Sequence, residues 1–185
     1  ETRRAVLALV DSARAAGLPT EPLIQKALEG ESKGATGERI VAAVHALLGR
    51  LREARGALGP TAGDAELVAG AAAISVGVSA DRLERLRRVG AGASLTLALV
   101  ALADLVQRGV PPDTAATAIE ALARVRSGEA EYRMLRQLVE QDIRTGAAPA
   151  AAALERARLI TGGRSPVIPP DGPPGPEPPN VGGER

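Results

Sequence analysis

The single histidine, His45, is the first residue to test for chemistry, because an imidazole can bind a metal ion or act as a general base. A typical zinc site takes three or four ligands, and a di-metal site in a helical bundle takes Glu-x-x-His pairs from two helices. Position 42 is an alanine, and the chain has no second histidine and no cysteine. The sequence therefore predicts no metal site, and it predicts His45 to be a structural residue that is either at the boundary of a helix face or partly buried.

Two pairs of nearby carboxylates are candidates for acid–base chemistry, Glu29 with Glu31 and Glu129 with Glu131. Most glycosidases cleave the sugar bond between two such groups. Both pairs are predicted near helix ends beside basic residues, and the chain has no Trp or Phe on which a sugar could stack. A solvated surface is therefore the favoured interpretation of both pairs.

The serines lack the setting of a catalytic nucleophile. No G-x-S-x-G segment is present, and His45 is the only imidazole that could activate a hydroxyl. Ser79, Ser94 and Ser127 stand at expected helix starts, where a hydroxyl accepts hydrogen bonds from backbone N–H groups. They are predicted to be N-caps. The sequence thus predicts no catalytic residue, and the chain is predicted not to be an enzyme.

Two glycine-rich stretches, GESKGATG at residues 30–37 and GAGAS at residues 90–94, have the composition of phosphate-binding loops but not their pattern. A P-loop places its lysine directly after the last glycine and follows a strand. Lys33 instead precedes Gly34, and a helix is expected before it. GAGAS lacks the third glycine of a dinucleotide fingerprint. No cofactor is therefore predicted.

The densest basic cluster, DRLERLRRV at residues 81–89, is a candidate for nucleic-acid binding. Its arginines are Arg82, Arg85, Arg87 and Arg88. Asp81 and Glu84 offset part of this charge, and the whole chain carries 23 basic and 22 acidic residues, for a formal net charge of +1. A protein without a basic face gains little from phosphate contacts, so no nucleic-acid partner is predicted.

The elements that must position these residues are predicted to be helices throughout. Aromatic residues make up 1% of the chain and apolar residues 45%, so Leu, Val, Ile and Ala must fill the core. The first helix has Ala5, Val6, Leu9, Val10 and Ala13 on one face. Helices are expected at about residues 3–16, 20–30, 37–57, 64–76, 79–89, 94–108, 112–125, 128–145 and 149–160. The predicted fold is an all-α domain over residues 1–160, either a compact bundle or a short helical-hairpin array of about eight or nine helices.

Four similar segments separate several of these helices: AAGLPTEPL, SVGVSADRL, QRGVPPDTA and RTGAAPAAA. Each contains a glycine suited to the left-handed conformation that ends a helix, followed by an apolar residue that can fold back on it. The glycines are Gly17, Gly77, Gly109 and Gly146, and the apolar residues are Leu18, Val78, Val110 and Ala147. Thr20, Ser79 and Asp113 are then predicted to start the next helices. A regular array would also need Gly56 to be a degraded junction of the same kind.

The most apolar stretch, VGAGASLTLALVALA at residues 89–103, is shorter than the roughly 20 residues that span a membrane. It is predicted to be a buried core helix, and no membrane span is expected. Under an alternative function, Leu97, Leu99, Val100 and Leu102 would line an apolar cleft for a small ligand or a lipid.

Residues 161–185 differ from the rest in composition and form the second predicted region, an extended Pro/Gly-rich tail. Its prolines are the predicted partner-binding residues: Pro166, Pro169, Pro170, Pro173, Pro174, Pro176, Pro178 and Pro179. Such an arm can reach a partner without folding by itself.

Together these observations predict a non-enzymatic helical protein that acts through protein–protein contacts, as a structural or accessory subunit of an assembly. The partner is expected to be another protein or a second copy of the chain. Because the sequence begins at Glu1 without Met, as a processed protein would, a periplasmic or extracellular location is expected.

Overall fold

The computed structural model describes residues 1–90 and 94–162, and in these ranges it contains nine α-helices and no strand. The helices are α1 (Thr2–Ala15), α2 (Glu21–Ser32), α3 (Gly37–Leu58), α4 (Asp64–Ser75), α5 (Ala80–Val89), α6 (Thr96–Gln107), α7 (Pro112–Arg124), α8 (Glu129–Arg144) and α9 (Pro149–Thr161). The predicted all-α class is confirmed. The predicted proline-rich arm and its eight prolines lie outside the described residues.

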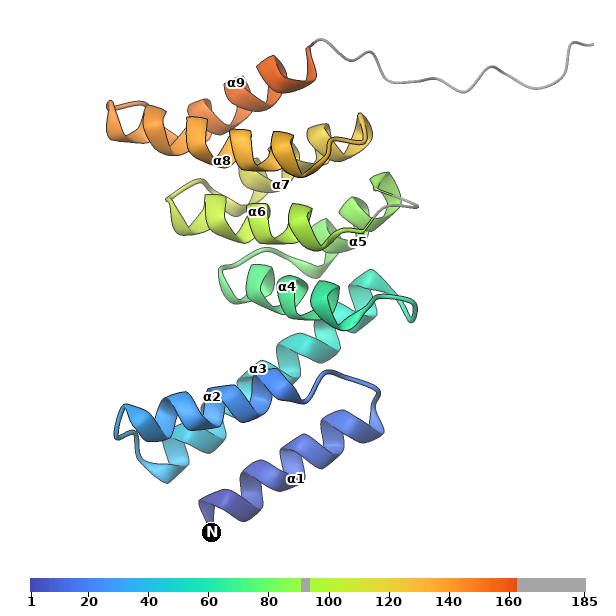
Figure 1. The fold of residues 1–185 in the computed structure, drawn as a ribbon, viewed down its shortest axis with the longest axis vertical. Coiled ribbons are helices and arrows are strands. Elements are labelled where there is room, and N and C mark those ends of the chain that lie inside the picture. Colours follow the sequence, from blue (N-terminus) through green and yellow to red (C-terminus); the bar gives the residue numbers. More distant parts are fainter. Residues whose placement is uncertain (91–93, 163–185) are drawn as a thin grey trace, which may run out of the picture.

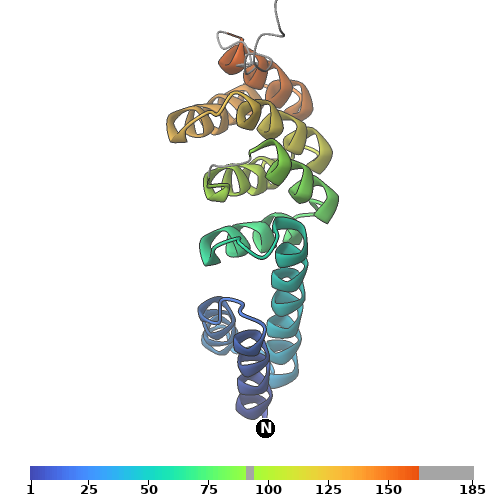
Figure 2. The same cartoon turned by 90° about the vertical axis from the view of Figure 1, so that its right-hand side faces the viewer.

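The helices stack in two layers (Figures 1 and 2). One layer holds α1, α3, α5, α7 and α9, each packed on the next, and the other holds α4, α6 and α8 in the same way. Hairpins therefore pack on their neighbours along the chain, as in repeat arrays. Of the two predicted arrangements, the structure has the helical-hairpin array.

The long helix α3 interrupts this regularity. Both α2 and α4 pack on α3, and Gly56 lies inside α3 with open space around it rather than at a junction. Gly56 is therefore not the degraded corner that a regular array would need, since a single glycine inside a run of good helix formers does not end a helix. The α3 helix ends instead at Gly59, whose φ is 87°.

The four predicted corners are confirmed as Schellman caps. At the first, the N–H of Leu18 donates to the carbonyl of Ala13 at 3.0 Å, and the N–H of Gly17 donates to Arg14 O at 3.0 Å. The same pair of bonds recurs at Gly77, Gly109 and Gly146, all with positive φ. The apolar residue that follows is buried at the first three corners, whereas Ala147 is exposed. A fifth corner uses Gly34, and a sixth uses Arg126 at a φ of 54°.

Only some of the predicted N-caps are confirmed. The hydroxyl of Ser79 accepts from Arg82 N at 3.4 Å and caps α5 as predicted. Ser94 accepts from Thr96 N at 3.4 Å, but the N-cap position of α6 belongs to Leu95. The prediction for Ser127 is wrong, because Gly128 occupies the N-cap of α8 and the carboxylate of Glu131 accepts its N–H. Thr20 occupies the N-cap position of α2 without a side-chain capping bond.

The core is built from leucine and alanine, and α6 contributes much of it. Leu99 and Leu102 are fully buried, but Leu97 and Val100 are 44% and 41% exposed. The four residues therefore do not line one cleft, because residues two apart on a helix point to different sides. In the described part of the chain, no helix has the length and apolarity required to cross a bilayer.

Candidate functional site: an apolar groove between α1 and α2

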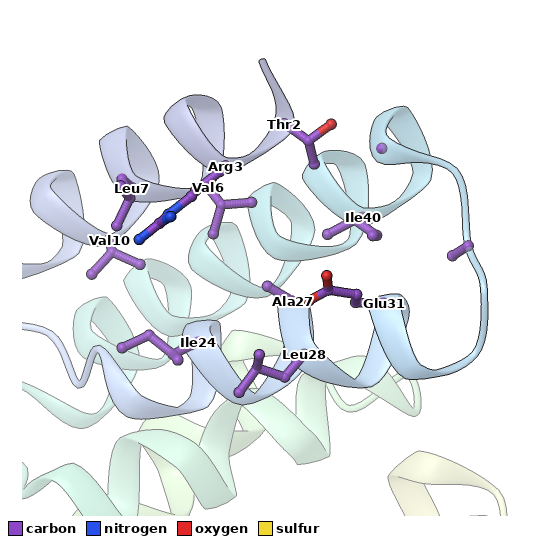
Figure 3. A pocket seen from close by; sticks show the side chains of 12 residues that line it. Thr2, Arg3, Val6, Leu7, Val10, Ile24, Ala27, Leu28, Glu31 and Ile40 are labelled. Carbon is purple, nitrogen blue, oxygen red and sulfur yellow. The ribbon is translucent and has the colours of Figure 1, made fainter.

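The first two helices form an antiparallel hairpin at one end of the stack and leave a groove between them (Figures 1 and 3). Its volume is about 780 Å³. The lining comes from three helices and the α2–α3 turn: Thr2, Arg3, Val6, Leu7, Val10, Ile24, Ala27, Leu28, Glu31, Ala35, Gly37 and Ile40. The helices α1 and α2 make few contacts with each other, since each packs mainly on α3.

Three large apolar side chains of the groove remain in contact with solvent. Leu7 on α1 is 52% exposed, and Ile24 and Leu28 on α2 are 37% and 52% exposed. In Figure 3, Leu7 projects from α1 and Ile24 and Leu28 from α2 toward the space between the helices. Val10, which also lines the groove, and Leu23 on α2 are buried. The groove therefore presents apolar surface that residues 1–90 and 94–162 leave exposed.

The local sequence explains this surface. Residues 5–10 of α1, AVLALV, are all apolar, and a helix can bury only one side against a single neighbour. Leu7 is not on the apolar face predicted for this helix, and in the structure it is exposed rather than packed in the core. On α2, Ile24 and Leu28 are four residues apart and lie on one side, while Leu23 faces the core. This spacing was the signal that could have revealed the groove.

Close contacts with α3 hold the two sides of the groove in place. A Cβ at Gly30 would lie 2.8 Å from Ile40 Cγ1, and a Cβ at Gly37 would lie 2.0 Å from Thr2 Oγ1. Arg55 on α3 donates to Gly17 O at 2.9 Å and to Pro60 O at 2.8 Å, which ties the α1–α2 corner to the α3–α4 loop. The hairpin is thus anchored at both ends, and its groove is preformed.

Charged residues flank the apolar centre. Arg3 on α1 and Glu31 on α2 line the groove. Arg14 and Glu21 lie farther along the same helices, and Glu21 borders a depression between α2 and α4 instead. All four are exposed. Arg14 also contacts Asp11 at 2.6 Å, and Glu21 accepts a 2.6 Å hydrogen bond from Gln25. The groove therefore has one basic and one acidic side chain in its lining, Arg3 and Glu31.

His45 lies away from this groove. It is exposed on α3 and borders a second, shallower depression on the other flank of α1, beside Val41 and Ala42. His45 is therefore not partly buried, and the buried residues next to it on α3 are Val44 and Leu48. Within residues 1–90 and 94–162, no three His, Asp or Glu side chains form a group that could hold a metal ion.

The two carboxylate pairs of the sequence are engaged separately. Hydrogen bonds from Lys33 and Lys26 lower the pKa of Glu29 to about 2. Glu31 instead borders the groove. Glu129 pairs with Arg133, while Glu131 accepts the N–H of Gly128 at 2.8 Å. The members of a pair therefore do not face one substrate position.

The basic cluster on α5 is divided between the core and the surface. Arg82 turns inward and contacts Asp113 at 2.9 Å and the buried Glu120 at 3.4 Å, both on α7. The hydrogen bond that Arg82 donates to the carboxylate of Asp113 raises the pKa of Arg82. Arg88 lies 3.8 Å from Glu84 on the same helix. These arginines thus serve contacts within the fold, which leaves less positive charge free than the sequence alone indicates.

What the groove can do chemically is hold apolar side chains against Leu7, Ile24 and Leu28, with Arg3 and Glu31 beside them. No known protein-family model, curated protein or solved structure matches the chain.

Proposed function

We propose that this protein is a helical-repeat binding protein, a structural or accessory subunit that receives a partner protein's helix in the groove between α1 and α2. The observation that carries the proposal is the concentration of Leu7, Ile24 and Leu28, all exposed, in one preformed groove. Isolated exposed apolar residues need no explanation, whereas a grouped set is typical of an interaction site.

The shape of the groove favours a helix as the partner. Two antiparallel helices form its walls and α3 its floor, so a third helix can lie lengthwise between them (Figure 3). Helix-in-groove recognition uses apolar anchors spaced three or four residues apart, with charged residues at the edges. Burying each exposed leucine or isoleucine contributes at most about 1.5–3 kcal/mol to binding.

Site-specific photo-crosslinking tests the proposal. A photoreactive amino acid at position 28 should capture a protein partner in cells of the source, and the same group at Leu159 is the matched control. Leu159 is 63% exposed and lies on α9, at the other end of the stack. A product at position 28 that disappears with Leu7→Asp supports the proposal. Equal capture from both positions, or no capture from any groove position, would contradict it.

A small-ligand or lipid-binding function is the alternative, because a volume of about 780 Å³ is in the range of small-molecule sites. Native mass spectrometry of the purified protein distinguishes the two functions. A co-purifying ligand that Leu28→Asp releases would favour the alternative, and a clean apo mass together with a crosslinked protein would favour the partner helix.

The absence of enzymatic activity and the location outside the cytoplasm remain predictions that belong to this proposal. Cell fractionation followed by detection of the native protein would test the location. Recovery with the cytosolic fraction would contradict it.

A further inference from the structure

We propose that a second surface, the depression between α2 and α4, binds a protein helix that is apolar on one side and basic in its last turn. This surface is separate from the groove between α1 and α2, so the inference does not rest on the proposed function. It follows from the packing of α4, from the exposed apolar residues in the depression and from the sign of the charges at one end of it.

The row of helices α4, α6 and α8 is not continued by α2. Within the row each helix packs directly on the next, whereas α2 packs on α3 and makes almost no contact with α4. A depression of about 590 Å³ lies where α2 and α4 are separated (Figures 1 and 2). The side of α4 that faces this depression is therefore not covered by a neighbouring helix.

The floor of the depression is an apolar side of α4 that begins with an acid. Asp64, Val68 and Ala72 line it at steps of four residues, so they lie along one side of the helix over about 12 Å. Val68 is 38% exposed, and Val100, which lines the depression from α6, is 41% exposed. Because most of the α4 residues here are alanines, the backbone of another helix can approach closely.

Among the described residues, the charged side chains that line this depression are both acids, Glu21 and Asp64. Each lies in the first turn of its helix, and α2 and α4 run in the same direction, so the two carboxylates share one end of the depression (Figure 1). Both are exposed. Glu21 accepts a hydrogen bond from Gln25, and neither acid has a basic partner within residues 1–90 and 94–162.

These features define the chemistry of the partner. An apolar trough with two unpaired carboxylates at one end is complementary to a helix with an apolar side and basic residues at one end. The basic residues belong in the last turn of a helix that lies antiparallel to α4, because the dipole of that helix also stabilises them there. The N-termini of α2 and α4 oppose a base with only about half an elementary charge each, which the full charge of each carboxylate exceeds.

Fluorescence anisotropy with the full 185-residue chain and two designed peptides tests the inference. Both peptides are helices of alanine, leucine and glutamine with the leucines on one side. One has two arginines in its last turn, and the other has two glutamates there. The arginine peptide should bind about threefold to thirtyfold more tightly, the ratio expected for two exposed ion pairs.

Two sets of variants locate the bound peptide. Glu21→Gln with Asp64→Asn should bring the two affinities within about twofold of each other, because the charges that distinguish the peptides are then removed. Val68→Asn should weaken binding of the arginine peptide about threefold to tenfold through lost apolar contact. Circular dichroism of every variant checks that the helices form.

Two control variants change similar residues outside the depression. Asp81→Asn with Glu155→Gln removes the same net charge and should keep the preference for the arginine peptide. Leu28→Asn in the groove between α1 and α2 should bind this peptide like the natural chain.

No binding of the arginine peptide would overturn the inference, as would equal affinities of the natural chain for the two peptides or a preference that survives Glu21→Gln with Asp64→Asn. Loss of binding with Leu28→Asn would place the peptide in the groove, which would overturn this inference while supporting the proposed function. Failure of the crosslinking at position 28 would contradict the proposed function and leave this inference unchanged.

Discussion

Asp104 on α6 accepts a 2.8 Å hydrogen bond at Oδ2 from Nε of Arg136 on α8. Arg108 donates to the same oxygen, also at 2.8 Å, and contacts Glu140 on α8 at 2.5 Å. Two successive hairpins are thus joined by a network of partly buried charges. On the other layer, Arg82 joins α5 to α7 through Asp113 and Glu120. These networks couple neighbouring repeats beyond their apolar packing.

The first prediction concerns acid stability. Partial burial by itself would raise the pKa of Asp104, but the hydrogen bonds from Arg136 and Arg108 outweigh it, so the pKa lies below its ordinary value. The folded protein therefore binds this proton less readily than the unfolded chain does. The stabilisation is complete above about pH 4 and is lost as the pH falls through the folded-state pKa. Urea unfolding should therefore give a smaller free energy of unfolding at pH 3 than at pH 7.

Asp104→Asn is the variant that isolates this effect. It should lower the free energy of unfolding at pH 7 by about 1.5–3 kcal/mol, because Arg136 and Arg108 lose a charged acceptor. It should also reduce the difference between pH 7 and pH 3, since the remaining acids titrate as before. An unchanged pH difference would show that Asp104 has no lowered pKa.

The second prediction compares two glycines inside helices. A Cβ at Gly70 on α4 would lie 3.0 Å from Leu58 Cδ1, 3.2 Å from Ala54 Cβ and 3.3 Å from Leu83 Cδ2. Gly70→Ala should therefore destabilise the fold by about 1–3 kcal/mol through overpacking. Gly49 on α3 has open space around it, so Gly49→Ala should stabilise by about 0.5–1 kcal/mol. Thermal unfolding of both variants should show a lower melting temperature for Gly70→Ala and a higher one for Gly49→Ala. Shifts in the same direction would contradict the packing described around these two glycines.

The third prediction concerns two leucines of α6. Leu102→Ala should lower the free energy of unfolding by about 2–5 kcal/mol, because Leu102 is fully buried. Leu97→Ala should change it by less than about 0.5 kcal/mol, because that side chain is 44% exposed. Chemical unfolding measures both values. Similar losses would mean that the two residues line one enclosed site.

The fourth prediction compares two helix corners. Gly109 has a φ of 91°, and a Cβ there would make only an ordinary contact with Pro149, so Gly109→Ala should cost about 1–2 kcal/mol through backbone strain. Arg126 already holds a φ of 54°, and Arg126→Gly should relieve strain and raise the free energy of unfolding by about 0.5–1 kcal/mol. Calorimetric melting temperatures should move in opposite directions. A lower melting temperature for Arg126→Gly would contradict the left-handed conformation assigned to Arg126.

Much of the fold could be predicted because its signals are local. The corner at Gly17 ends a helix through contacts within a few residues, so its glycine and the apolar Leu18 were readable from the chain. Arg126 was not, because it makes the same corner without a glycine. Ser127 was misassigned because either of two adjacent residues could serve as the N-cap, and the capping bond of Glu131 to Gly128 decided between them.

The candidate site was not predicted, because exposure depends on neighbours distant in sequence. The periodicity of α1 showed that Val6 and Val10 share a face, but it could not show that α2 would leave Leu7 uncovered. Likewise, the sequence could not show that His45 would be exposed, because it does not reveal which helices pack on each side of α3.

The sequence by itself determined the helical class, the approximate helix limits and most of the corners, since these follow from propensity, periodicity and short-range hydrogen bonds. The stacking of the hairpins in two layers, the packing of both α2 and α4 on α3, and the apolar groove between α1 and α2 depend instead on the tertiary structure. A side chain is buried only when another helix packs on it, and the sequence of one helix does not reveal which helix that is.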